Sequence, residues 1–184
     1  MPIPACDLTI ESFEFNECDN TPAGIHWEIK GTFVKWLDPI PAQDDYPTTG
    51  LPLNISSDIT LDTVTHTTAT WATWQGVPNK SSFESEASGD PGAIGIASFV
   101  EFFVPGAYEQ FSWILSKSLN RPMMFMYRYN NNKWRTLGSP DFPAFLTYKE
   151  ATGKAAGDEI GYTVRIEVGV HSTAFPWYSG TVPS

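Results

Sequence analysis

Alternation of apolar and polar residues predicts most of the strands in this chain. Between residues 161 and 171 the apolar positions are Tyr162, Val164, Ile166, Val168 and Val170, and the positions between them are Thr163, Arg165, Glu167, Gly169 and His171. Successive side chains of a strand point to opposite faces, so this segment is predicted to be a half-buried strand. Residues 26–37 alternate in the same way, and Gly31 there indicates a bulge or a close approach of another chain segment.

Further strands are predicted from apolar runs bounded by turn residues. The run 96–104 is apolar on both faces, which is typical of a strand in the middle of a packed sheet. Residues 123–129 and 133–137 flank an Asn-rich turn and are predicted to form a hairpin. Residues 144–150 favour another strand, and the Thr-rich run 58–74 fits one long strand or two short ones.

One segment has the spacing of a helix. In residues 107–120 the apolar residues Tyr108, Phe111, Leu115 and Leu119 recur at intervals of three or four, which places them on one helical face. The sequence Asn120-Arg121-Pro122 then ends the pattern, because a residue before proline disfavours helical geometry.

Three segments are predicted to be connections. Residues 1–23 contain a short strand candidate and a turn-rich stretch, and we expect them to form an N-terminal arm. Residues 38–57 carry four prolines and three aspartates, so they predict an extended loop. Residues 75–95 are predicted to be a flexible connection with a turn at 89–92. The whole chain, 1–184, is therefore expected to be one mainly β domain, a two-sheet β-sandwich or flattened barrel with one flanking α-helix.

Composition narrows the classes of partner. The chain carries 21 acidic and 11 basic residues, a net charge of −10, and no basic stripe, which excludes binding through nucleic-acid phosphates. The first residues lack the charged and apolar regions of a signal peptide, and we expect no membrane span. Cys6 and Cys18 could pair if the N-terminal segment folds back, and the alternative is two reduced thiols.

Motif searches favour no catalytic, cofactor or metal site, so the chain is not expected to be an enzyme. His26, His66 and His171 are widely spaced, which does not suggest a shared metal ion. The acidic pairs Asp44-Asp45 and Asp158-Glu159 are interpreted as solvated loop residues, since acid–base chemistry needs a shifted pKa. The segment 157–161 is interpreted as a tight turn into the last long strand.

The aromatic residues leave two interpretations open. The chain has 7 tryptophans, and Trp71 and Trp74 lie close together in the Thr-rich run. If exposed on a sheet, they would form a platform on which sugar rings stack. The alternative is that such tryptophans pack in the core or in a protein interface.

The C-terminal third combines three short motifs in a fixed order. A Trp-x-x-Leu-Gly strand end precedes a Thr-Gly-x-Ala-Ala-Gly-Asp-x-x-Gly-Tyr-Thr loop and strand, and a short aromatic tail follows. Their residues are Trp134, Leu137, Gly138, Thr152, Gly153, Ala155, Ala156, Gly157, Asp158, Gly161, Tyr162, Thr163, Pro176 and Tyr178. In this order of motifs the segment resembles a group of phage and prophage tail proteins from Bacteroidetes hosts. The order of predicted elements over 96–137 also fits, and the N-terminal half has no counterpart.

This resemblance implies a structural virion protein similar to the tail tube fold of long-tailed phages. Its copies would form stacked, hexameric rings with a continuous sheet between subunits, and would contact other virion tail proteins. The arm 1–23 and the loop 38–57 would connect rings, and DNA would pass through an acidic lumen without specific binding. Assembly would take place in the cytoplasm of the bacterial host. Two alternatives remain: a carbohydrate-binding or adhesion module, and another virion part such as a tail terminator, hub or capsid decoration protein.

Overall fold

The protein is mainly β with one α-helix. The computed structural model describes residues 27–42, 54–77, 80–90, 92–129, 133–153, 159–171 and 175–183. The predicted arm 1–23 with Cys6 and Cys18, and residues 43–53 of the predicted loop, lie outside the described residues. The strands are β1 Trp27–Phe33, β2 Asn54–Ile55, β3 Ala72–Gly76, β4 Ser82–Ser88, β5 Gly95–Pro105, β6 Met123–Arg128, β7 Trp134–Leu137, β8 Ala144–Ala151, β9 Gly161–His171 and β10 Trp177–Tyr178; the helices are the 3-10 turn η1 Val34–Trp36 and α2 Glu109–Ser118.

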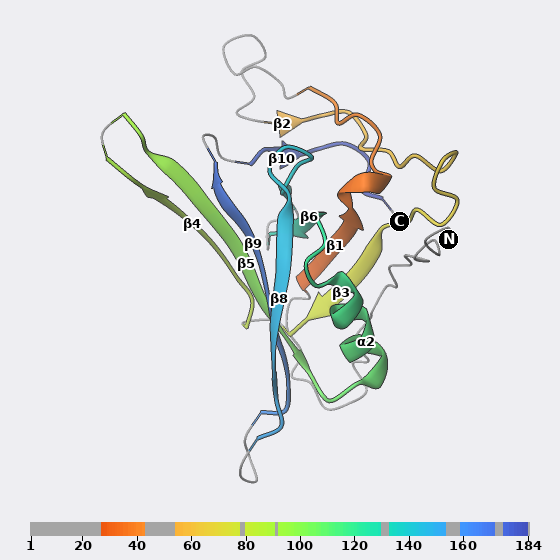
Figure 1. Cartoon of the computed structure of the whole chain (residues 1–184), viewed down its shortest axis with the longest axis vertical. Coiled ribbons are helices and arrows are strands. Elements are labelled where there is room, and N and C mark those ends of the chain that lie inside the picture. Colours follow the sequence, from red (N-terminus) through yellow and green to blue (C-terminus); the bar gives the residue numbers. More distant parts are fainter. Residues whose placement is uncertain are drawn as a thin grey trace, which may run out of the picture.

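The ten strands belong to one mixed sheet, which we divide into two parts at the single contact between β6 and β8 (Figure 1). We call these parts the first sheet and the second sheet. The first sheet has the order β3-β1-β6-β7-β10-β2, and the second sheet has the order β8-β9-β5-β4. All neighbours are antiparallel except β2 and β10. A single residue pair, Met123 with Ala144, joins the sheets. The backbone nitrogen of Val77 also donates a 2.8 Å hydrogen bond to the carbonyl of Phe103, but no strand pair within the described segments closes a barrel, so the fold is an open sandwich.

The main core lies between the two sheets. Trp74 is fully buried, and its ring centroid lies 5.6 Å from that of Phe125 on the same sheet and 6.5 Å from that of Phe102 on the other. The helix α2 closes one end of this core with Phe111, Ile114 and Leu115. The predicted helix is therefore confirmed, although it is shorter at both ends, and Asn120 with φ 57° follows it. Within the described residues, no helix is long and apolar enough to cross a membrane.

A second apolar cluster covers the opposite face of the first sheet. It contains Ile55, Ile59, Trp71, Met124, Met126, Trp134 and Tyr178. Strand β6 contributes to both clusters, so its residues from Met123 to Tyr127 are all buried. The two ends of the predicted loop 38–57 are held here, because Ile40 packs on this cluster and Asn54–Ile55 pairs with β10.

Five predicted strands are present within about two residues of their expected ends, as β5, β6, β7, β8 and β9. The predicted hairpin is confirmed, since β6 and β7 pair antiparallel. The strand predicted over 26–37 ends early, because residues 34–36 turn into η1 after β1.

The Thr-rich run 58–74 forms neither the one long strand nor the two short strands that its pattern allowed. Only its last residues enter β3, and the rest is irregular, with turns at 63–65 and 67–68. The carboxylate of Asp62 is the cause, since its Oδ1 accepts hydrogen bonds from the nitrogens of Val64 and Thr65 at 3.1 and 2.9 Å. Bonding to Thr65 in particular lowers the pKa of Asp62. An aspartate that satisfies its own downstream amides stabilises a turn in competition with a strand.

The connection predicted for residues 75–95 contains the strand β4, which the apolar pattern missed. Strand β4 pairs with β5 over its full length, from Ser82 with Glu101 to Ser88 with Gly95. All of its residues except Phe83 are exposed, so it has no buried face that hydrophobicity could indicate. The expected turn after it is present, and the nitrogen of Ala93 donates to the carbonyl of Asp90 at 2.8 Å.

Near the end of strand β9 the side chains exchange faces, so the simple alternation predicted from the sequence fails there. Between the pairs Ser98–Val168 and Ile96–His171, β9 advances one residue more than β5, which is a β-bulge. Because the extra residue shifts the alternation by one, Val170 is 65% exposed and His171 is 4% exposed. The expected positions of these two side chains were therefore wrong.

Candidate functional site

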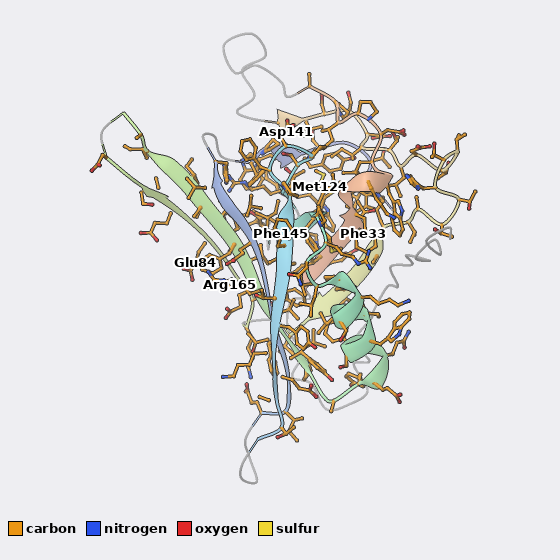
Figure 2. All side chains as sticks on the ribbon, viewed as in Figure 1. Phe33, Glu84, Met124, Asp141, Phe145 and Arg165 are labelled. Atoms are coloured by element: carbon orange, nitrogen blue, oxygen red, sulfur yellow. The ribbon has the colours of Figure 1, made fainter. Side chains whose placement is uncertain are left out.

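The second sheet has one face on the core and one face that no described element covers. We call the second side the open face. Register places on it Glu84 and Glu86 of β4, Phe99, Glu101 and Phe103 of β5, Thr163, Arg165 and Glu167 of β9, and Phe145, Thr147 and Lys149 of β8. Figure 2 labels Glu84, Arg165 and Phe145 along these strands. Their neighbours Val100, Val164 and Ile166 point into the core, so strict alternation produces this face.

Charged and aromatic side chains alternate across the open face. One row runs from Glu84 through Phe99 and Glu167 to Phe145, and the next includes Glu101 beside Arg165. Phe145 is 40% exposed, and Phe99 and Phe103 are partly buried. The face is thus polar with shielded rings, which differs from the contiguous apolar patch of a tight hydrophobic interface.

Cations of the chain cover two of these rings, those of Phe99 and Phe103. The guanidinium carbon of Arg165 lies 3.8 Å from the centroid of Phe99, and its Nε donates to Glu167 Oε2 at 3.1 Å. The ammonium of Lys80 lies 5.0 Å from the centroid of Phe103 and forms an ion pair with Glu159. Cation–π and ion-pair contacts of this kind hold the positive charges close to the sheet.

Three of the four carboxylates of the open face remain turned to solvent, while Glu167 pairs with Arg165. Glu84 and Glu86 are exposed and Glu101 is partly exposed, and none makes an ion pair with a described residue. Lys149, exposed on β8, also forms no ion pair within the described segments. Since two cations oppose four carboxylates on these strands, the open face carries a negative potential.

Both outer edges of the second sheet lack a strand partner among the described residues. Strand β4 pairs only with β5. Strand β8 pairs with β6 only at Ala144, so its seven later residues, 145–151, pair on one side only, with β9. Exposed edges present rows of backbone donors and acceptors that another strand can satisfy. In Figure 1, β4 and β5 project as a long hairpin away from the rest of the body.

A cavity of about 360 Å³ lies on the other side of the molecule, beside His171. The rings of His171 and Phe175 pack in a tilted arrangement with centroids 4.3 Å apart, and the hydroxyl of Thr136 donates to the carbonyl of Pro176 at 3.2 Å. These contacts hold the segment after β9 against β7. The polar groups of His171 and Thr136 that line the cavity therefore belong to the packing of this segment.

Residues considered for metal binding are not brought together where the structure describes them. No three His, Cys, Asp or Glu side chains of the described segments form a cluster that could hold an ion. His66 lies in the turns before β3, while His171 ends β9. His26, Asp44, Asp45 and Asp158 lie outside the described residues, and Glu159 pairs with Lys80.

The proposed sugar platform at Trp71 and Trp74 is wrong. Trp71 is 5% exposed and Trp74 is fully buried, so neither ring can stack on a ligand. Trp113 on α2 is 43% exposed, but the ammonium of Lys117 lies 3.8 Å from its ring centroid. Trp71 and Trp74 therefore pack in the interior, which agrees with the alternative interpretation.

The clearest pKa shifts among tyrosines belong to packed residues. Burial raises the pKa of Tyr127 well above its usual value, and the hydrogen bond with Tyr129 acts in the same direction. Burial also raises the pKa of Tyr162 and Tyr178. Such shifts keep these hydroxyls protonated within packed regions.

Sequence reasoning missed the open face because it missed β4. A signal was present, since Ser82, Glu84, Glu86 and Ser88 alternate with Phe83, Ser85 and Ala87. This is the two-residue period of a strand with one fully polar face.

Comparison with known proteins assigns no family to this chain, because no family model, curated protein or solved structure matches it.

Proposed function

We propose that this chain is a structural protein of a bacteriophage virion, the tail tube subunit, whose copies join side by side around a channel for DNA. The observation that supports this proposal is the second sheet, which combines an acidic open face with two outer edges that no other described strand pairs with. The resemblance of the C-terminal third to phage tail proteins supports the same function.

The charge of the open face suits a wall along which DNA slides. Duplex DNA carries one negative charge per about 1.7 Å of its axis, and proteins retain it by contacting phosphates with Lys and Arg. On the open face, Arg165 is engaged by Phe99 and Glu167, while Glu84, Glu86 and Glu101 point to solvent. Among the described residues of this face, Lys149 is the cation that phosphates could still reach, and three solvent-facing carboxylates outnumber it.

The unpaired edges suit assembly from copies of one chain. An isolated sheet edge invites pairing with another strand, and proteins that stay monomeric usually block such edges. Head-to-tail contacts between identical subunits close into rings when the rotation between them allows it. A tail terminator, hub or decoration protein would share this chemistry, but it would give a single ring or an isolated attachment.

Negative-stain electron microscopy and sedimentation of the purified protein test the proposal. We expect rings with a central hole that stack into tubes as concentration rises. A monomer at all concentrations would contradict an assembling subunit, and single rings that never stack would favour a terminator or hub. Duplex DNA should not be retained by the assemblies even at low salt, and retention would contradict an acidic channel.

A further inference from the structure

We propose that β4 of one copy pairs antiparallel with β8 of the next copy, with Glu84 opposite the neighbouring copy's Lys149. This inference rests on the proposed assembly function and names the two edges that make its contact. Four features of the second sheet support it: strand direction, length, facing and charge.

Strand direction is the first feature. The neighbours in β8-β9-β5-β4 are all antiparallel, so β4 and β8 run in opposite directions. A second copy that is rotated about a ring axis without inversion therefore presents its β8 antiparallel to β4. The alternating sheet then continues from subunit to subunit with no change of pattern.

The lengths of β4 and β8 and the faces of their side chains indicate the same register for the pair. Strand β4 has seven residues, and the unpaired part of β8 also has seven, residues 145–151. Full overlap pairs Ser82 with Ala151 and Ser88 with Phe145. In this register the open-face side chains of one copy lie beside the open-face side chains of the next copy. A slip by one residue would place every side chain of one strand on the opposite face of the shared sheet.

Charge selects the partner edge. Full overlap places Glu84 directly opposite Lys149, and both side chains are exposed and make no ion pair with any described residue of their own copy. Opposite charges on directly opposed residues stabilise a strand pair. Lys149 is also the cation of the open face that no ring or carboxylate of the described chain engages.

The same charges disfavour a two-fold dimer. If β4 paired with β4 of a second copy about Ser85, Glu84 of each copy would oppose Glu86 of the other. Like charges directly opposite one another destabilise such a pair.

The edge of β8 is accessible from the side of the open face. The helix α2 meets β8 on its core side, where the hydroxyls of Ser116 and Tyr148 lie 3.5 Å apart.

Charge reversal tests the pairing. We expect Glu84→Lys and Lys149→Glu each to weaken the contact between copies about tenfold at low salt, because each creates a like-charged pair. The double variant, which exchanges the two charges within one chain, should restore assembly. Sedimentation and electron microscopy measure the assembly, thermal unfolding confirms that each variant is folded, and Lys35→Glu, on η1, is the matched control.

A cysteine pair tests the register. In a Cys6→Ser, Cys18→Ser background, Glu84→Cys with Lys149→Cys should form disulfides between copies under mild oxidation, since directly opposed strand residues have the required spacing. Non-reducing electrophoresis should show a ladder that ends at the ring size, and either cysteine alone should not.

The outcomes separate the inference from the proposed function. Rings that persist in both single reversals, with no cross-linked ladder, would overturn the β4–β8 contact and leave the assembly function standing. Disulfide dimers from Glu84→Cys alone would show a two-fold β4 contact and overturn it as well. A wild-type protein that stays monomeric, with no ladder from the cysteine pair, would overturn both.

Discussion

A β-carbon built on Gly31 would lie 2.6 Å from Cε1 of Phe125 on the neighbouring strand β6. The close approach expected at Gly31 is therefore confirmed, and Phe125 occupies the space that any larger residue would need. The ring of Phe125 is itself buried against Trp74, at 5.6 Å between centroids, so it has little room to move aside.

Gly31→Ala should therefore destabilise the fold by about 1–3 kcal/mol, the usual cost of overpacking a dense core. Chemical denaturation measures this change. Gly169→Ala is the matched control, because no atom lies within 4 Å of a β-carbon at Gly169 on β9. Equal effects of the two substitutions would contradict the close approach.

The bulge in β9 predicts opposite results for two valines separated by one residue. Val168→Thr should cost about 1–3 kcal/mol, because Val168 is 3% exposed and its new hydroxyl would be buried. Val170→Thr should change the free energy of unfolding by less than about 0.5 kcal/mol, because Val170 is 65% exposed. Regular alternation would bury both side chains, so two similar losses would argue against the bulge.

Two tryptophans with different surroundings provide a third prediction. Trp74→Ala should destabilise the protein by about 3–5 kcal/mol, since Trp74 is fully buried between Phe102, Phe111 and Phe125. Trp113→Ala should cost less than about 1 kcal/mol, the contribution of an exposed cation–π contact such as that with Lys117. Intrinsic fluorescence during denaturation reports both values, and a mild effect at Trp74 would contradict its place in the core.

Stability should fall as the solution becomes alkaline. Burial raises the folded-state pKa of Tyr127, so above the unfolded value of about 10 the folded state holds a proton that the unfolded state has lost. Above pH 10 the free energy of unfolding therefore falls by up to about 1.4 kcal/mol per pH unit for one such group. Below pH 10 the stabilisation that depends on this proton is fully present. Denaturation between pH 9 and pH 11 measures this slope.

Tyr127→Phe is the control for the alkaline loss. It removes one titrating hydroxyl and the 3.4 Å contact with Tyr129, but leaves Tyr162 and Tyr178, whose pKa values are raised in the same direction. The decline above pH 10 should become shallower. An unchanged slope would place the titrating groups elsewhere.

Strong apolar patterns made much of the fold predictable from the sequence. The segments that became β5, β6, β7, β8 and β9 have buried faces, and α2 has a buried stripe that includes Phe111 and Leu115. These local patterns survive in the structure because burial of those same residues builds the core. The prediction of a mainly β sandwich with one helix followed from them.

The remaining features depend on contacts that a local pattern does not contain. Strand β4 is held by its pairing with β5 rather than by burial, and its exposed residues therefore looked like a loop. Asp62 turns a Thr-rich stretch away from sheet structure through two backbone hydrogen bonds. The facing of Val170 and His171 is set by register against β5, which only the assembled sheet defines. The open face became recognisable only with the pairing of β4 and β5, although the alternation of Ser82, Glu84 and Glu86 already has the period of a strand.

The two sheets differ in how widely their strands are spread along the polypeptide. The strands of the second sheet lie between residues 82 and 171, whereas the first sheet needs both β1, which begins at Trp27, and β10, which ends at Tyr178. The first sheet is therefore completed only when distant segments of the chain meet. Pairing over such long sequence separations slows folding to the range of milliseconds to seconds.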